Sequence, residues 1–117
     1  MTCVFCEYDP KYYLAENEFF YAIQDKYPVA KGHTLIVSKR HCDTFFDLNP
    51  EEVLALQEIT IRIKKELDVH YSSEAYNLAM NCGAAAGQSI GHFHLHIIPR
   101  KASDKVSAFR RIREGLF

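Results

Sequence analysis

The sequence lacks long apolar runs, and its longest stretches of apolar residues extend over only a few positions. A helix that spans a bilayer needs about 20 predominantly apolar residues, so the sequence excludes a membrane protein of that kind. The first seven residues, Met1 to Glu7, also lack the basic and apolar regions of a secretory leader. We therefore expect a cytoplasmic protein that has no membrane partner.

A surplus of charge of one sign is missing as well. The 14 lysines and arginines nearly balance the 15 aspartates and glutamates, and the formal net charge is −1 with neutral histidines. A nucleic-acid groove requires a concentration of positive charge. This balance therefore gives no reason to expect a nucleic-acid partner, and it argues against a zinc-dependent nucleic-acid binder.

Repeats, linkers and low-complexity stretches are absent too, apart from a short small-residue loop at residues 83–87. A chain of 117 residues, 48% of them hydrophobic, is long enough for one core and too short for two. The sequence therefore predicts a single domain over residues 1–117. Its last part, residues 101–117, forms a basic tail, which is either a solvated helix face or a rim that attracts phosphorylated ligands.

Hydrophobic periodicity and capping signals predict an α+β domain. Asn49, Pro50 and Glu52 have the spacing of a capping box, and an apolar stripe of Val53, Leu56, Ile63 and Leu67 continues the helix to residues 68–71. We expect strands at residues 19–24, 33–38, 75–81 and 91–98, separated by turn residues. This order indicates an antiparallel sheet covered by the helix on one face.

Three histidines alternate with apolar residues near the end of the chain. His92, His94 and His96 are separated by Phe93 and Leu95, and Ile97 follows. Side chains alternate between the two faces of a strand, so we expect the imidazoles on one polar face and the apolar residues in the core. The first and last imidazoles would lie roughly 13 Å apart along the strand at ~3.3 Å per residue, so one metal ion cannot bind all three.

The four cysteines fall into two groups. Cys3 and Cys6 have the Cys-x-x-Cys spacing, which in a reducing compartment indicates half of a zinc site, with a redox pair or unligated thiols as alternatives. Cys42 and Cys82 have no such pairing. We expect these two to be small buried hydrophobic residues.

A loop rich in small residues leads directly into the histidine segment. It runs from Asn81 to Ser89 and includes Gly83, Gly87 and Gln88. Backbone N–H groups, side-chain amides and a hydroxyl can all donate hydrogen bonds to phosphate oxygens. An ordinary hairpin connection is the alternative for the loop alone, whereas its position beside three histidines indicates an oxyanion site.

The sequence resembles the histidine triad (HIT) family of nucleotide hydrolases and transferases. The family signature, three histidines alternating with apolar residues, corresponds to His92-Phe93-His94-Leu95-His96-Ile97-Ile98, and residues 32–41, 81–83 and 87–89 also match family patterns in order. The resemblance implies an antiparallel sheet of about five strands with one main helix on one face and a short C-terminal helix. It also implies a homodimer that acts on a purine nucleotide.

Roles for individual residues follow from this resemblance. His94 would attack the α-phosphate and form a covalent nucleotidyl-histidine, and a neutral imidazole is a competent nucleophile near pH 7. His96 would bind the phosphoryl oxygens or assist the leaving group. Asp25 would accept hydrogen bonds from the ribose, with a turn role as the alternative. The remaining contacts to the phosphate would come from Asn81, Gly87, Gln88 and Ser89, with Ser89 also assigned to catalysis.

The resemblance also completes a structural zinc site. Members of the zinc-containing branch combine the N-terminal Cys-x-x-Cys, here in a knuckle at residues 1–8, with two histidines that correspond to His41 and His92. The ligand set would then be Cys3, Cys6, His41 and His92. Four protein ligands leave no open position for water, so this zinc would stabilise the fold rather than catalyse hydrolysis.

The remaining assignments are less specific. His33 falls near the active site of relatives without a role that we can assign, and His70 is expected on the surface. Phe5, Phe20 and Ile23 would either sandwich the base or pack in the core.

Several activities are compatible with these residues. The leading hypothesis is a hydrolase of a nucleoside phosphoramidate or a dinucleoside polyphosphate that releases a nucleoside monophosphate. The alternatives are a nucleotidyltransferase and a nucleotide-binding regulatory module with little catalysis. Because one transferase branch has glutamine at the third triad position, His96 favours hydrolysis.

Overall fold

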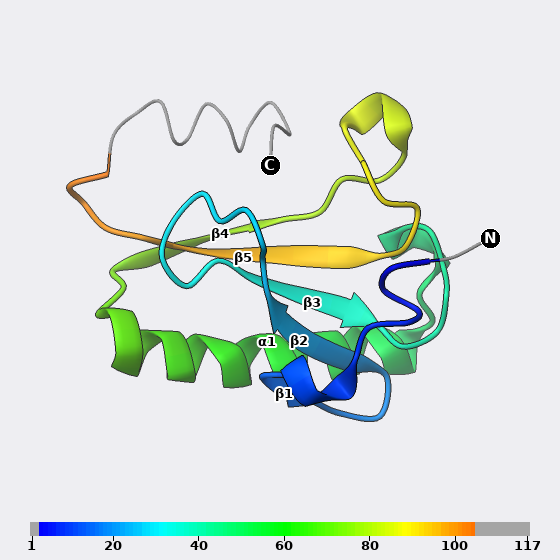
Figure 1. Ribbon diagram of the computed structural model, residues 1–117, viewed down its shortest axis with the longest axis horizontal. Helices are drawn as coiled ribbons and strands as arrows, with labels where there is room; N and C mark the ends of the chain where they lie inside the picture. The colour runs from blue at the N-terminus through cyan, green and yellow to red at the C-terminus, as the bar shows by residue number, and fades with distance from the viewer. Residues whose placement is uncertain (1–2, 105–117) are drawn as a thin grey trace.

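The computed structural model describes residues 3–104, and its centre is a five-stranded antiparallel sheet with the order β1-β2-β3-β5-β4 (Figure 1). One long helix, α1, crosses one face of the sheet, as the α+β prediction requires. The strands are β1 (Ala15–Glu16), β2 (Phe20–Gln24), β3 (Thr34–Ser38), β4 (Ala75–Ala79) and β5 (His94–Arg100), and α1 is Pro50–Tyr71. Three short 3-10 helices are η1 (Pro10–Tyr12), η2 (Phe45–Asp47) and η3 (Ala84–Ala86).

The start of α1 confirms the predicted capping box. The Asn49 side chain accepts a hydrogen bond from the Glu52 backbone N–H, and the Glu52 carboxylate accepts one from the Asn49 N–H. The buried stripe of α1 consists of Glu52, Leu56, Ile59, Ile63 and Leu67. Val53 was expected on this stripe but is exposed, because it lies about 100° round the helix from Glu52.

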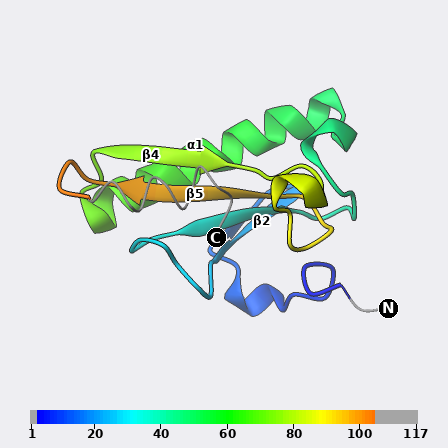
Figure 2. The ribbon, with the colours of Figure 1, turned by 90° about the horizontal axis from the view of Figure 1, so that it is seen from above.

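Hydrophobic residues cover both faces of the sheet. On the face under α1, Phe20, Ala22, Ile36, Leu95 and Ile97 pack against the helix. On the opposite face, the N-terminal segment before β1 runs below the sheet (Figure 2) and its Phe5 joins a cluster of Tyr21, Ile23, Leu35 and Val37. The Phe5 ring contacts His92 and His94 on this second face, and His92 and His96 are buried rather than open to solvent.

The strands differ from their predicted bounds mainly next to the histidines. β5 begins at His94 rather than at residue 91, because the His92 N–H donates to the Ile90 carbonyl in a local turn. β4 ends at Ala79 rather than at residue 81, where the chain turns into the glycine loop. β1 was not predicted, and its two residues are too few to produce a periodic pattern.

No helix within residues 3–104 is long and apolar enough to cross a membrane. The predicted short C-terminal helix and most of the basic tail lie outside the described residues.

Candidate functional site

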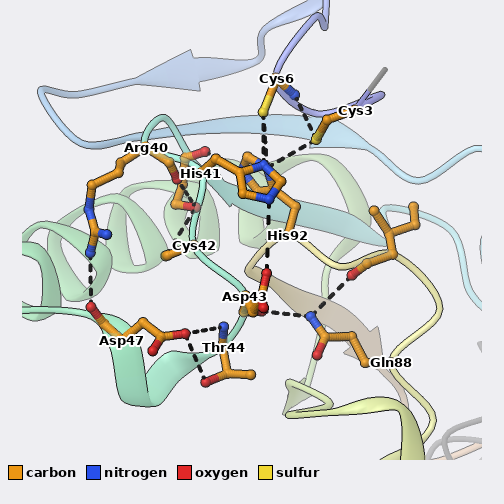
Figure 3. A network of polar contacts seen from close by, with 12 residues as sticks. Cys3, Cys6, Arg40, His41, Cys42, Asp43, Thr44, Asp47, Gln88 and His92 are labelled. Atoms are coloured by element: carbon orange, nitrogen blue, oxygen red, sulfur yellow. Dashed lines mark hydrogen bonds and ion pairs between the residues drawn. The ribbon is translucent and has the colours of Figure 1, made fainter. Parts of the chain in front are cut away.

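Two cysteines and two histidines from three parts of the chain meet at one point beside β5 (Figure 3). Cys3 and Cys6 come from the N-terminal turn, His41 from the loop after β3, and His92 from the turn before β5. The Cys6 sulfur lies 3.0 Å from His41 Nδ1, and His92 Nδ1 lies 3.2 Å from His41 Nδ1 and 3.3 Å from the Cys3 sulfur. Tetrahedral zinc bonds of ~2.0–2.3 Å separate neighbouring ligand atoms by about 3.3–3.8 Å. The four donor atoms lie within 4.8 Å of one another, and the shorter pairs would have to move apart by a few tenths of an ångström to hold a four-coordinate ion.

Hydrogen bonding prepares His92 as a metal ligand. Its Nε2 lies 2.7 Å from the Ser38 carbonyl oxygen, and a carbonyl can only accept, so Nε2 carries the proton. The lone pair of Nδ1 then points at the two sulfurs and at His41. Burial lowers the pKa of His92, so the ring stays neutral, and this is the arrangement that metal-binding histidines require.

The Cys6 thiol of the cluster ionises less readily than a free cysteine. A hydrogen bond with Cys3, followed by burial, raises the pKa of Cys6 to about 11. Thiolate is the form that binds metal, so metal binding at Cys6 releases a proton.

A second group of potential ligands lies further along β5, at His96, with His33 and Asp25. His33 Nε2 is 2.9 Å from His96 Nδ1 and 3.3 Å from Asp25 Oδ2. The Val29 N–H donates to His33 Nδ1 at 3.1 Å, so the proton of a neutral His33 ring is on Nε2. A metal on Nε2 would move this proton to Nδ1, against the Val29 N–H. We therefore interpret this group as a hydrogen-bond chain.

This hydrogen-bond chain determines which ring nitrogen of His96 carries a proton. Burial, followed by the neighbouring His94 and His33, lowers the pKa of His96 to about 3, and burial also lowers the pKa of His33 against the opposing effect of Asp25. Both rings are neutral near pH 7. Since His96 Nδ1 accepts the proton of His33 Nε2, His96 Nε2 carries a proton and is a hydrogen-bond donor.

His94 lies between the two groups. Its neutral ring carries the proton on Nδ1, whereas those of His92 and His96 carry it on Nε2. Its Nδ1 is 2.8 Å from the His92 carbonyl oxygen, so Nδ1–H donates and Nε2 keeps its lone pair. Burial lowers the pKa of His94, and the hydrogen bond to His92 opposes this only in part. The Phe5 ring packs against His94 at 5.1 Å between centroids. The result is a neutral imidazole with a basic nitrogen, the form that nucleophilic attack requires.

The glycine loop before His92 turns through η3. Gly83 and Gly87 flank η3 with φ angles of 99° and 94°. Residues other than glycine rarely adopt such positive φ angles. Asn81 donates to the Gly87 carbonyl, and Ser89 is exposed. Gln88 was predicted as a phosphate ligand, yet its side-chain amide contacts backbone groups on two loops.

Asp25 has the turn role that the sequence left open. Its Oδ1 accepts the Tyr27 N–H at 2.8 Å, while Oδ2 faces His33. Next to it lies a hollow of about 430 Å³ lined by aromatic and polar residues: Tyr8, Tyr12, Leu14, Gln24, Asp25, Lys26, Pro28, Gly32 and His33. Phe5 and Ile23 lie on this face of the sheet, whereas Phe20 packs under α1 and cannot contact a base there.

His33 and Ser38 are site residues that sequence reasoning left without a role. Both are on or beside β3, which pairs with β5 so that Leu35 is opposite His96 and Val37 is opposite His94. A histidine at the start of the strand beside the triad was the available signal for His33. No pattern indicates Ser38, because it contributes only its backbone carbonyl.

The fold and the histidine cluster define the class of this protein as a histidine triad protein. A family model described as the HIT domain matches residues 8–103, and the chain belongs to this family. It is 37% identical over 115 residues to adenylylsulfatase HINT3 of Arabidopsis thaliana, which covers 95% of this chain and 58% of the relative. It is 32% identical over 104 residues to adenosine 5'-monophosphoramidase HNT1 of Saccharomyces cerevisiae, covering 86% of this chain and 63% of the relative. The chain thus spans about three fifths of each of these two relatives.

A solved structure supports the fold assignment. A zinc-bound histidine triad family protein from Mycobacterium smegmatis superposes with a TM-score of 0.81 at 32% identity, and the match covers 99% of this chain and 94% of that protein.

Proposed function

We propose that the protein is a hydrolase that cleaves at the α-phosphate of a purine nucleotide conjugate through a covalent nucleotidyl intermediate on His94. The observation that carries this proposal is the hydrogen bond from His94 Nδ1–H to the His92 carbonyl. It leaves the basic Nε2 available, and burial keeps the ring neutral near pH 7.

The reaction has two displacements. His94 Nε2 forms a bond to the α-phosphorus while the bond from phosphorus to the leaving group breaks, and the leaving group takes the electron pair. Water then attacks phosphorus, the N–P bond breaks, and the nucleoside monophosphate departs. The proton that this water releases balances the proton that the leaving group acquires. The cationic nucleotidyl-histidine is stabilised by the same His92 carbonyl.

The other predicted residues bind the substrate in this proposal. The Nε2–H of His96 donates to the phosphoryl group, and we assign the remaining phosphate contacts to Ser89, Asn81 and the backbone of the loop at Gly87 and Gln88. Asp25, beside the hollow lined by Tyr8 and Tyr12, accepts hydrogen bonds from the ribose hydroxyls. An aromatic wall is suited to a base because every base has a π-face.

The names of two relatives support a proposal for the substrate class. One is called an adenylylsulfatase and the other an adenosine 5'-monophosphoramidase. Both names describe AMP joined to a leaving group, so we propose an adenosine phosphoramidate as the first substrate to test, with a dinucleoside polyphosphate as the second.

We predict that His94→Ala lowers turnover of an adenosine phosphoramidate by at least about 10³-fold, because the covalent step is lost. AMP affinity should change only a few-fold, since the pocket remains. Intact-protein mass spectrometry after brief incubation should detect an acid-labile nucleotidyl adduct on the wild type and none on the variant.

His70→Ala is the matched control, because His70 is an exposed histidine at the end of α1. It should retain both adduct and turnover. AMP binding without adduct or turnover in the wild type would instead support a nucleotide-binding module, and transfer of AMP to an acceptor other than water would support a transferase.

We further propose that the metal at Cys3, Cys6, His41 and His92 is a structural zinc. Two sulfur and two nitrogen donors whose ligand atoms converge within 4.8 Å of one another are characteristic of such sites. A reducing cytoplasm, which we propose as the compartment, keeps both cysteines available as ligands.

Native mass spectrometry should detect a single zinc ion on each wild-type chain. Cys6→Ser and His41→Ala should abolish stoichiometric binding and lower the free energy of unfolding, because zinc binding contributes to folding. Cys82→Ser is the control, since Cys82 is outside the cluster, and it should keep its zinc. A wild-type chain that binds no zinc would contradict the proposal.

We propose that two copies of the chain form a homodimer through the face formed by α1 and β4. β4 is at the end of the sheet order, and an apolar groove of about 650 Å³ lies between this strand and the helix. Leu54 and Leu78 on this face are 69% and 56% exposed. Contiguous exposed apolar surface of this kind marks an interaction site, and a two-fold axis would cover it on both copies.

Light scattering coupled to size exclusion should give a mass about twice the 13.5 kDa of one chain. Leu54→Asp combined with Leu78→Asp should give the mass of a single chain, because burying unpaired charges of one sign in the interface is unfavourable. Val69→Asp, on the exposed side of the same helix, should remain a dimer. A wild type with the mass of one chain would overturn the dimer proposal.

A further inference from the structure

The side chain of Gln88 connects the loop that carries His41 to the glycine loop (Figure 3). Its Nε2 donates to the Asp43 carbonyl at 2.6 Å and to the Ile90 carbonyl at 3.1 Å. Its Oε1 accepts the Gly83 N–H at 2.7 Å. All three partners are backbone groups, and they come from both loops.

The orientation of this amide is determined by its partners. A flipped amide would direct its NH₂ at the Gly83 N–H and its oxygen at two carbonyl oxygens, and every contact would become repulsive. Both amide hydrogens have acceptors in the observed orientation. Gln88 therefore acts as a spacer of fixed length between the Asp43 carbonyl and the Gly83 N–H.

On the metal side, the loop after β3 is held at several points. The Arg40 guanidinium makes two bonds to the buried carboxylate of Glu52 on α1, at 2.8 and 3.1 Å. The Cys42 carbonyl accepts the Phe93 N–H at 2.7 Å. Gln88 adds the contact at Asp43, two residues after the metal-ligating candidate His41, so the position of His41 depends in part on Gln88.

In the glycine loop, the side chain of Gln88 fixes the start of η3. The Gly83 carbonyl accepts the N–H groups of Ala86 and Gln88, while the Gly83 N–H is bound by the Gln88 side chain. The loop therefore closes on itself around Gly83. A shift of the Asp43 carbonyl would be transmitted through Gln88 to this closed turn.

We propose that Gln88 is a positioning residue that couples metal binding at His41 to nucleotide binding at the glycine loop. This proposal rests on the function proposed above, because it assumes that the glycine loop contacts the phosphate of a nucleotide. Coupling between two sites is reciprocal in binding free energy, so Gln88 acts on both affinities without being a zinc ligand.

The test is the variant Gln88→Met, which keeps the length of the side chain and removes all three hydrogen bonds. Zinc affinity is measured without nucleotide by competition with a chelator, and AMP affinity is measured on the zinc-loaded protein by calorimetry. Both should weaken by about 10-fold or more, the scale on which outer-shell partners affect metal affinity. A direct phosphate ligand would weaken AMP binding and leave zinc affinity unchanged.

Asn17→Leu is the matched control for general destabilisation. The Asn17 amide also bonds to backbone groups of two elements, the Ala55 carbonyl and the N–H groups of Phe19 and Phe20, away from both loops. Its zinc and AMP affinities should stay within about 2-fold of the wild type. If both variants lost zinc and AMP affinity equally, general destabilisation would explain the losses, and the proposal would be overturned.

Amide hydrogen exchange of the wild type provides a test without substitution. Chelation of zinc should accelerate exchange of the Gly83 N–H by about 10-fold or more while Ile36 in the central strand β3 stays protected. An unchanged Gly83 rate, or a variant that loses only one of the two affinities, would overturn the coupling. A zinc-loaded wild type that binds no AMP would overturn the proposed function instead, while the zinc affinity of Gln88→Met still tests the contact with the His41 loop.

Discussion

Three groups of His92 face three different sets of partners, and the rest of the site depends on this arrangement. Its Nε2–H donates to the Ser38 carbonyl, its Nδ1 points at Cys3, Cys6 and His41, and its own carbonyl accepts the Nδ1–H of His94. The first contact anchors the residue to β3, and the second makes it available to a metal. The third determines which nitrogen of His94 is basic. One residue thus links the fold, the metal ligands and the proposed nucleophile.

Burial supplies the second requirement of the site, which is neutral imidazoles near pH 7. The Phe5 ring of the N-terminal segment packs against His92 and His94, and burial lowers the pKa of His33, His94 and His96. The tautomers then follow from fixed partners: the Val29 N–H determines the proton position on His33, and the His92 carbonyl determines it on His94. Neighbouring rings therefore have different functions, with His94 presenting a lone pair and His96 a proton.

The sequence predicted the helix and the strands better than the tertiary contacts around the site. The capping box at Asn49 and Glu52 is a local signal, and the alternation correctly placed His94 and His96 on one face of β5, whereas His92 lies in the turn before the strand. The alternation did not indicate that Phe5 packs against His92 and His94, because packing by a distant segment leaves no periodic pattern. The resemblance supplied Cys3, Cys6, His41 and His92 as a set, and the structure brings these four together. The contacts of Gln88 could not be predicted, since they involve backbone groups whose positions exist only in the folded loops.

The most direct test of this account is the tautomer of His94, because the proposed attack depends on a neutral ring with its proton on Nδ1. Long-range ¹H–¹⁵N correlation spectra of the zinc-loaded protein, recorded from pH 8 to pH 5, distinguish the two neutral tautomers and the imidazolium. We predict the Nδ1–H tautomer at pH 7 and a titration midpoint below the usual value for histidine, since burial lowers the pKa of His94. A ring protonated on Nε2, or an imidazolium at pH 7, would contradict it.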